Sequence, residues 1–122
     1  MGKPVIHWQI MTKDPEKAQT FYSQLFGWKM DDNNPLKYTL VDTQAKSGIQ
    51  GGIWKIPPEA ENRITIYVQV EDLPTYINKA KALGARVLVP PQSLPLPNGD
   101  AIALIQDPTG LVIGLVKEKS QI

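Results

Sequence analysis

The sequence predicts an α+β domain built from two successive modules, each with the element order βαβββ. Three observations predict this fold class: the chain repeats itself at an offset near 58 residues, each half holds one capped helix, and short strand-like runs separated by turn residues follow each helix. A length of 122 residues is typical of one domain. We therefore expect a single domain over 1–122, with module one at 4–57, a linker at 58–62 and module two at 63–118.

The repeat is clearest where each helix begins and ends. Asp72 follows Asp14 by 58 residues, and Gly84 follows Gly27 by 57. Aspartate is a favoured residue at a helix N-cap, and glycine commonly ends a helix in the left-handed conformation. Between cap and glycine, both halves place apolar residues at helical spacing. The spacing predicts one helix between Asp14 and Gly27 and another between Asp72 and Gly84.

The other predicted elements are strands. Their residue ranges are 6–11, 28–30, 38–42 and 49–56 in the first half, and 64–70, 86–89, 101–106 and 111–117 in the second. Residues typical of turns separate them at 32–35, 90–91, 97–100 and 107–110. The first strand of each half alternates with period two, which places alternate side chains on opposite faces. We expect the aliphatic set, which in the second half is Ile64, Ile66, Val68 and Val70, to face the helices.

Composition and charge exclude several classes of function. The chain has no cysteine and one histidine, which excludes disulfide frameworks, zinc ribbons, thiol catalysis and any site that needs two imidazoles from one subunit. A net charge of +1 provides no strong field for binding nucleic acid or a membrane surface. No apolar run approaches the roughly 20 residues of a membrane-spanning helix. With no secretory signal in the sequence, we expect a cytoplasmic protein.

Three stretches of the sequence carry a family resemblance. They are 7–29, which ends its helix with Leu-Phe-Gly-Trp, 68–85, and the turn 106–110 with the sequence Gln-Asp-Pro-Thr-Gly. Together with the repeated βαβββ order, they make the chain resemble the vicinal oxygen chelate superfamily, which includes glyoxalase I, extradiol dioxygenases and bleomycin resistance proteins. The stretches 51–53, 87–91 and 101–108 look like its uncharacterised glyoxalase-like branch. The resemblance implies that the two modules form a curved mixed sheet with a concave cleft, the glyoxalase/bleomycin resistance fold.

The resemblance also implies where a metal ion would be bound. Metal enzymes of the superfamily take one ligand from the first strand and one from the last strand of each module. Those positions are His7, Gly52, Thr65 and Gly114 in this chain. Glycine offers no side-chain donor, and a threonine hydroxyl is a weak one. We therefore predict no metal ion and no cofactor.

A mixed set of side chains is expected to line the cleft that the resemblance implies. The predicted ligand-binding residues are His7, Gln9, Gln50, Trp54, Thr65, Tyr67 and Gln69. Aromatic, amide and imidazole groups without a carboxylate suit a small organic ligand held by stacking and neutral hydrogen bonds. The alternative is that these side chains face water on an open sheet, and that His7 is a structural residue.

Three functional hypotheses follow. The first is a glyoxalase-like protein that binds a small organic molecule without a metal ion. The second is a metal-independent isomerase or lyase in which His7 is the general base. The third is a structural or regulatory homodimer. The sequence leaves open whether the protein is an enzyme, what its ligand is, and whether the modules pair within one chain or across a dimer.

Overall fold

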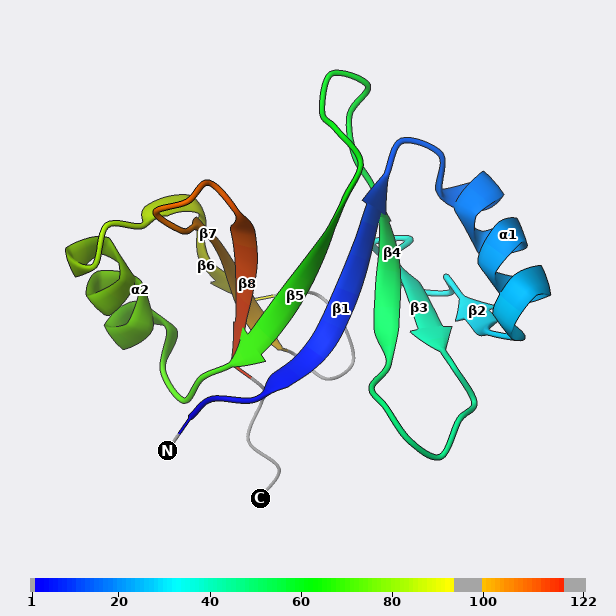
Figure 1. Ribbon diagram of the computed structural model, residues 1–122, viewed down its shortest axis with the longest axis horizontal. Helices are drawn as coiled ribbons and strands as arrows, with labels where there is room; N and C mark the ends of the chain where they lie inside the picture. Colours follow the sequence, from blue (N-terminus) through cyan, green and yellow to red (C-terminus); the bar gives the residue numbers. More distant parts are fainter. Residues whose placement is uncertain (1, 94–99, 118–122) are drawn as a thin grey trace. The chain divides into compact units, whose positions relative to one another are not determined.

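The computed structural model describes residues 2–93 and 100–117, and it confirms the predicted element order (Figure 1). Each half of the chain contains a strand, a helix and three further strands. The chain divides into two compact units, which we treat separately. The first unit is Ile6–Thr65, and the second unit is Met1–Val5 together with Ile66–Ile122.

The first unit is a four-stranded mixed sheet flanked by one helix. Its elements are β1 (Val5–Thr12), α1 (Pro15–Phe26), β2 (Lys29–Asp31), β3 (Thr39–Asp42) and β4 (Gly51–Lys55). The strand order is β2-β3-β4-β1, and β1 runs parallel to β4 while the other pairs are antiparallel. Helix α1 packs against β2 and β4 (Figure 1).

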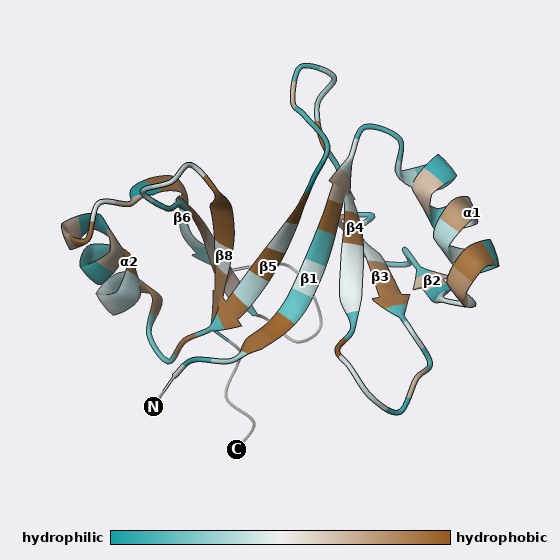
Figure 2. Cartoon of the chain, viewed as in Figure 1, coloured by the Kyte–Doolittle hydropathy of each residue, from teal (hydrophilic) through white to brown (hydrophobic). Residues whose placement is uncertain are grey.

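The register between β1 and β4 assigns side chains to the two faces of this sheet. Trp8 lies beside Gly51, and Gln9 lies beside Gly52. Successive residues of a strand point to opposite faces, so Trp8 and Gln9 lie on opposite sides of the sheet. Each shares its face with the glycine that it pairs with. The side of Trp8 is the helix side, because its ring centroid lies 5.1 Å from that of Trp28, the residue that connects α1 to β2. Figure 2 shows hydrophilic residues in the middle of β1 and hydrophobic residues on either side of them. The face that carries Gln9 is thus turned away from α1.

The second unit repeats this arrangement. Its elements are β5 (Arg63–Gln69), α2 (Leu73–Ala82), β6 (Arg86–Ser93), β7 (Ala101–Gln106) and β8 (Val112–Lys117). The strand order is β5-β8-β7-β6, with β5 parallel to β8. Its core is formed by five buried residues of α2 and the sheet side that it covers: Val70, Leu73, Ile77, Ala103 and Leu115.

Both helices begin and end as their sequences predict. The Asp14 side chain accepts a hydrogen bond from the Lys17 backbone N–H at 3.1 Å, and Asp72 accepts one from Thr75 N–H at the same distance. Gly27 follows α1 with φ of +72°, in the left-handed region that favours glycine. These contacts satisfy backbone groups that a helix end leaves without intrahelical partners.

Strand β6 differs from the prediction. The sequence predicts a turn at Pro90 and Pro91, but the strand continues through both prolines to Ser93. β6 lies at the edge of the sheet, and its register with β7 shifts between Val87 and Val89 and again before Gln92. Proline is tolerated at such edges and bulges because no ladder hydrogen bond is lost there. Residues 97–99 of the turn predicted at 97–100 lie outside the described residues.

The predicted aliphatic face of β5 is only half correct. Val68 and Val70 pack with the core beneath α2, as expected. Ile64 is 68% exposed and Ile66 is 38% exposed. The reason is the reach of the helix: α2 packs on β6, β7 and β8, and the core that it covers includes only the last residues of β5.

The length and polarity of a helix decide whether it can span a membrane. Among the described residues, neither α1 nor α2 is long and apolar enough to cross a membrane.

The turn before β8 depends on one carboxylate. Asp107 accepts hydrogen bonds from the Thr109 hydroxyl at 2.7 Å, from Thr109 N–H at 2.8 Å and from Leu111 N–H at 3.1 Å. The Thr109 hydroxyl is the main cause that holds the pKa of Asp107 below its ordinary value of 3.8. A depressed pKa means that this contribution to stability is present above the ordinary value and is lost as pH falls through the folded-state value.

Replacing this carboxylate should therefore reduce the sensitivity of the fold to acid. We expect Asp107→Asn to lower the free energy of unfolding at about pH 7 and to show a smaller further loss than the wild type below about pH 4. Urea unfolding followed by circular dichroism across this pH range measures both quantities. Asp32→Asn, at an exposed aspartate before β3, is the matched control. Equal acid sensitivity of Asp107→Asn and the wild type would contradict the assignment.

Candidate functional site

The face of the first unit that is turned away from α1 gathers four polar and aromatic side chains. His7 and Gln9 are two residues apart on β1 and therefore share a face. Trp54 on β4 lies two residues beyond Gly52, which pairs with Gln9. Tyr38, which immediately precedes β3, extends its side chain over Gly52. We call His7, Gln9, Tyr38 and Trp54 the Tyr38 cluster.

Tyr38 connects the other members of this cluster. The His7 Nε2 atom lies 2.7 Å from the Tyr38 hydroxyl oxygen, and that hydroxyl donates to Gln9 Oε1 at 3.1 Å. The Tyr38 ring centroid is 5.7 Å from the Trp54 ring and 6.2 Å from the His7 ring. Gln9 is only 7% exposed, whereas the other three side chains are half-buried. The arrangement joins a buried amide, an imidazole, a phenol and an indole.

The absence of a side chain at Gly52 makes this position of Tyr38 possible. A Cβ atom at residue 52 would stand 1.9 Å from the Tyr38 hydroxyl oxygen and 2.2 Å from Cζ, closer than any real contact. The backbone of Tyr38 is fixed on both sides by Asn34, whose Oδ1 accepts from Tyr38 N–H at 3.1 Å and whose Nδ2 donates to Tyr38 O at 2.6 Å. The loop before β3 and the bare backbone of β4 together hold the phenol in place.

Sequence reasoning missed Tyr38, which it treated only as the first residue of a strand. A signal was available in the Gly51-Gly52 pair. Glycines inside a strand often mark the close approach of another group. Here each glycine accommodates an aromatic ring, because a Cβ at Gly51 would lie 2.2 Å from the Trp8 ring. The sequence does not say which aromatic residue covers which glycine.

Two other predicted ligand-binding residues of the first unit have partners elsewhere. Gln50 is exposed, and its Oε1 accepts a hydrogen bond from Thr43 N–H at 2.7 Å, which braces the loop between β3 and β4. Thr65 is 1% exposed, and its hydroxyl lies 3.5 Å from the sulfur of Met11. The hydrogen bonds of Gln50 and Thr65 thus go to residues outside the Tyr38 cluster.

The remaining predicted residues, Tyr67 and Gln69, belong to the second unit. Tyr67 is 5% exposed and pairs with Gly114 across β5 and β8. Its ring covers that glycine, since a Cβ there would lie 2.4 Å from two ring carbons. Gln69 is half-buried, and its backbone N–H donates to Pro4 O at 2.9 Å. A tyrosine ring therefore covers the last-strand glycine in each unit.

These observations test whether the four family positions fit a divalent metal ion. His7 uses Nε2 in its contact with Tyr38, and Thr65 offers only a neutral hydroxyl. Gly52 and Gly114 offer no donor, and a tyrosine occupies the space of each missing side chain. Within 2–93 and 100–117, no three His, Asp or Glu residues gather as a metal-holding group. The residues present do not fit an ion held by the four positions.

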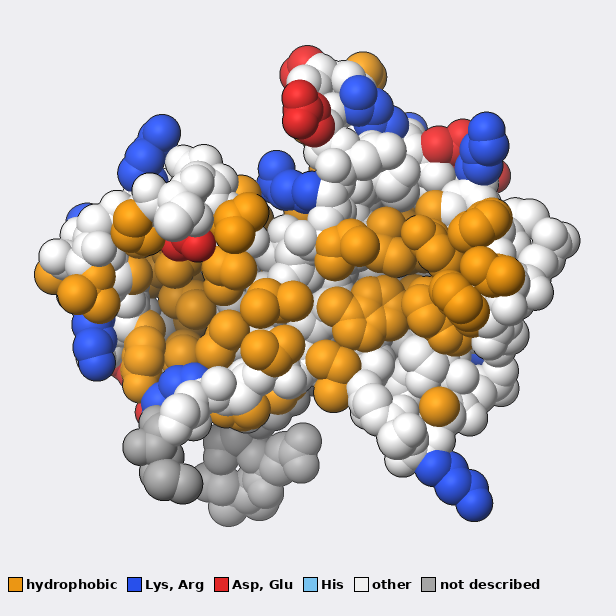
Figure 3. Space-filling view, in the orientation of Figure 1, with side chains coloured by type: hydrophobic (Ala, Val, Ile, Leu, Met, Phe, Trp, Pro, Cys, Tyr) orange, Lys and Arg blue, Asp and Glu red, His pale blue; other side chains and the backbone are white. Residues whose placement is uncertain are grey.

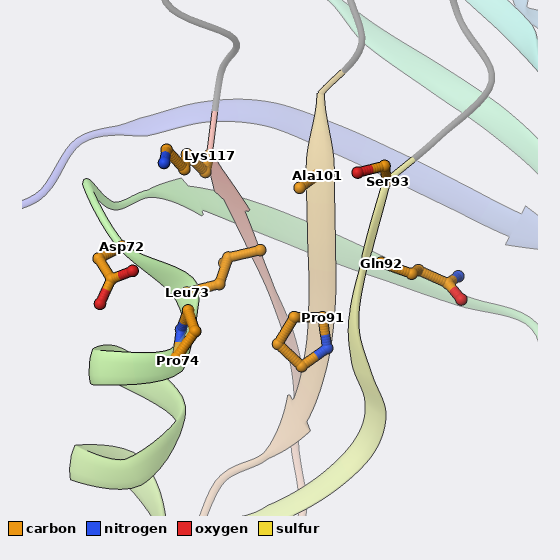
Figure 4. Close-up of a pocket in the computed structure, with 8 residues that line it drawn as sticks. All are labelled: Asp72, Leu73, Pro74, Pro91, Gln92, Ser93, Ala101 and Lys117. Atoms are coloured by element: carbon orange, nitrogen blue, oxygen red, sulfur yellow. The ribbon is translucent and has the colours of Figure 1, made fainter.

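A pocket of about 270 Å³ lies in the second unit, and its lining includes none of the predicted site residues. Figure 4 shows its lining at the start of α2 and along β6 to β8: Asp72, Leu73, Pro74, Pro91, Gln92, Ser93, Ala101 and Lys117. Its carboxylate, Asp72, already caps α2 by accepting from Thr75. The negative charge of the pocket lining is therefore engaged in holding the helix.

Comparison with known proteins identifies the relatives of this chain. It is 30% identical over 117 residues to CFP32 of Mycobacterium bovis and Mycobacterium tuberculosis, provisionally named a glyoxylase, with 87% of this chain aligned. The chain spans 42% of the length of these relatives.

Solved structures show the same fold at lower identity. A glyoxalase/bleomycin resistance protein/dioxygenase superfamily member from Vibrio splendidus matches with a TM-score of 0.65 and 14% identity, covering 97% of this chain and 100% of that one. The Mn(II)-bound glyoxalase of Novosphingobium aromaticivorans matches with a TM-score of 0.63 and 16% identity, covering 98% of this chain and 40% of that one. The predicted glyoxalase/bleomycin resistance fold is confirmed. The sequence model of the glyoxalase-like domain matches residues 7–116, and the chain therefore belongs to the glyoxalase-like domain family.

Proposed function

We propose that this protein binds a small, uncharged organic molecule at the Tyr38 cluster without a metal ion. The observation that carries the proposal is the position of the Tyr38 hydroxyl, 2.7 Å from His7 Nε2 and directly over Gly52. Tyr38 thus hydrogen-bonds to His7 and covers Gly52, which are two of the positions at which the superfamily binds its metal. Membership of the glyoxalase-like domain family supports small-molecule binding in general.

The chemistry of the cluster indicates the kind of ligand. Trp54 and Tyr38 offer half-buried aromatic rings with centroids 5.7 Å apart, and such rings stack on planar groups. Leu40, which pairs with Gly52 on the neighbouring strand and is 46% exposed, extends the apolar surface. His7 and Gln9 add neutral hydrogen-bonding groups. A planar ring that carries a polar substituent matches this combination better than an ion does.

Truncating the aromatic side of the cluster should weaken binding. We expect an uncharged aromatic ligand found in a thermal-shift screen to stabilise the wild type, because a ligand that binds the native state raises apparent stability. Trp54→Ala should then raise the Kd about tenfold through lost stacking, and His7→Ala should raise it by a similar factor.

Titration calorimetry measures these affinities. Lys55→Ala, at the exposed residue next to Trp54 on β4, is the control and should bind like the wild type. Unchanged affinity in both cluster variants would place the ligand elsewhere and overturn the proposed site.

The 2.7 Å contact between His7 and Tyr38 also favours a second candidate, a metal-independent isomerase or lyase. An imidazole accepts a proton near neutral pH, and the contact with Tyr38 holds the ring of His7 in one orientation. This candidate requires turnover of a bound ligand that His7→Ala abolishes. Binding without turnover leaves the first proposal in place and removes the second.

The exposed face of α1 supports a homodimer in addition to ligand binding. No α1 side chain is buried, and Phe21, Leu25 and Phe26 are each more than half exposed. Figure 3 shows hydrophobic side chains gathered over α1. The repeat provides an internal comparison, because the residue 58 positions after Phe21 is the exposed Lys79. The fold thus accepts a solvated lysine at this position of the helix and does not itself require an aromatic residue. An exposed aromatic ring at Phe21 is therefore consistent with contact to a second copy of the chain.

Placing a lysine on this face should separate the copies. We expect the wild type to be dimeric by light scattering and Phe21→Lys to be monomeric, with an unchanged free energy of unfolding per chain after correction for association. Thr20→Lys adds the same charge at the neighbouring exposed residue and should remain dimeric. A monomeric wild type, or a dimeric Phe21→Lys variant, would contradict this assignment.

A further inference from the structure

We infer that the hydrogen bonds from His7 through Tyr38 to Gln9 run in one direction and hold neutral His7 as its Nε2–H tautomer. The second ring nitrogen, Nδ1, is then the atom at which His7 accepts a proton or a hydrogen bond. Tyr38 is the positioning residue that fixes this choice.

The direction of these hydrogen bonds follows from Gln9, the residue at which they end. Gln9 turns its carbonyl oxygen, Oε1, toward Tyr38, and an amide oxygen can only accept. The Tyr38 hydroxyl has a single proton, and it donates that proton to Gln9 at 3.1 Å. The 2.7 Å contact with His7 must therefore use a proton carried by His7 Nε2. A neutral imidazole has one N–H, so Nδ1 has none.

The surroundings of Tyr38 hold its hydroxyl in place. Asn34 binds both backbone groups of Tyr38, and the phenol lies on the bare backbone of Gly52. Gln9, whose Oε1 accepts from the Tyr38 hydroxyl, is 7% exposed. The acceptor, the hydroxyl and the imidazole are thus arranged before any ligand arrives.

This arrangement has consequences for the chemistry of the site. Any group of the protein or of a ligand that hydrogen-bonds to Nδ1 of neutral His7 must be an O–H or N–H donor. If His7 acts as a base, the proton goes to Nδ1, and the imidazolium keeps its Nε2–H bond to Tyr38.

The tautomer can be measured directly because His7 is the only histidine in the 122-residue sequence. Long-range ¹H–¹⁵N correlation spectra of the ¹⁵N-labelled, ligand-free protein at a pH at which the ring is neutral report the two ring nitrogens separately. We expect a protonated, pyrrole-type signal for Nε2 and an unprotonated, pyridine-type signal for Nδ1. Tyr38→Phe removes the acceptor for Nε2–H, so both signals should shift toward the averaged position of mixed tautomers.

Two further variants sharpen this test. Gly52→Ala places a Cβ 1.9 Å from the Tyr38 hydroxyl oxygen, so it should displace the phenol and reproduce the shift of Tyr38→Phe with the tyrosine still present. Tyr22→Phe removes the hydroxyl of a tyrosine that stacks with Phe26 and Trp28, and it should leave the His7 signals unchanged.

The wild-type spectrum alone decides the proposal if a variant fails to fold. A pyrrole-type Nδ1, or averaged signals in the wild type, would overturn it, as would a Tyr38→Phe spectrum identical to that of the wild type. Because no ligand is added, the result is independent of the proposed function. A ligand screen without a hit would count against binding at the Tyr38 cluster and leave the tautomer as measured.

Discussion

The missing side chain at Gly52 is the constraint on which the candidate site depends. With only a backbone at that position, β4 leaves room for the phenol of Tyr38, and the hydroxyl reaches both His7 and Gln9. Any other residue at 52 and the present position of Tyr38 exclude each other on steric grounds. A ligand-bearing side chain at position 52 and the hydrogen-bonded Tyr38 in its present place are therefore mutually exclusive. The side chains that gather there offer hydrogen bonds and aromatic stacking.

The second unit shows that this is a property of the repeated module. Tyr67 covers Gly114 as Tyr38 covers Gly52, although Tyr67 reaches its glycine from the neighbouring strand β5 and Tyr38 from the loop before β3. The helices of the two units, by contrast, differ in how much they bury. α2 buries Leu73 and Ile77 in the core of its unit, whereas α1 buries no side chain and exposes aromatic residues. The modules thus share their architecture and their covered glycines, and they differ in the surface that each helix presents.

Local signals in the sequence predict most of the fold and only part of the site. Asp14 and Gly27 define their helix because capping acts within a few residues, and the repeat transfers the same reasoning to Asp72 and Gly84. The exposure of Ile64 was not predictable from alternation, because the reach of α2 over the sheet is a tertiary property. His7, Gln9 and Trp54 follow from strand periodicity and the family resemblance. Tyr38 does not, since its place depends on a loop conformation that Asn34 sets through two hydrogen bonds.

We propose that His7 is engaged by Tyr38 and does not bind a metal ion. Titration of the purified protein with Mn²⁺, followed through the ring signals of its one histidine, tests this claim most directly, because a paramagnetic ion broadens the signals of the nuclei beside it. The account predicts that equimolar Mn²⁺ leaves the His7 signals as sharp as those of exposed residues elsewhere in the chain. Selective broadening of the His7 signals at a one-to-one ratio would contradict it.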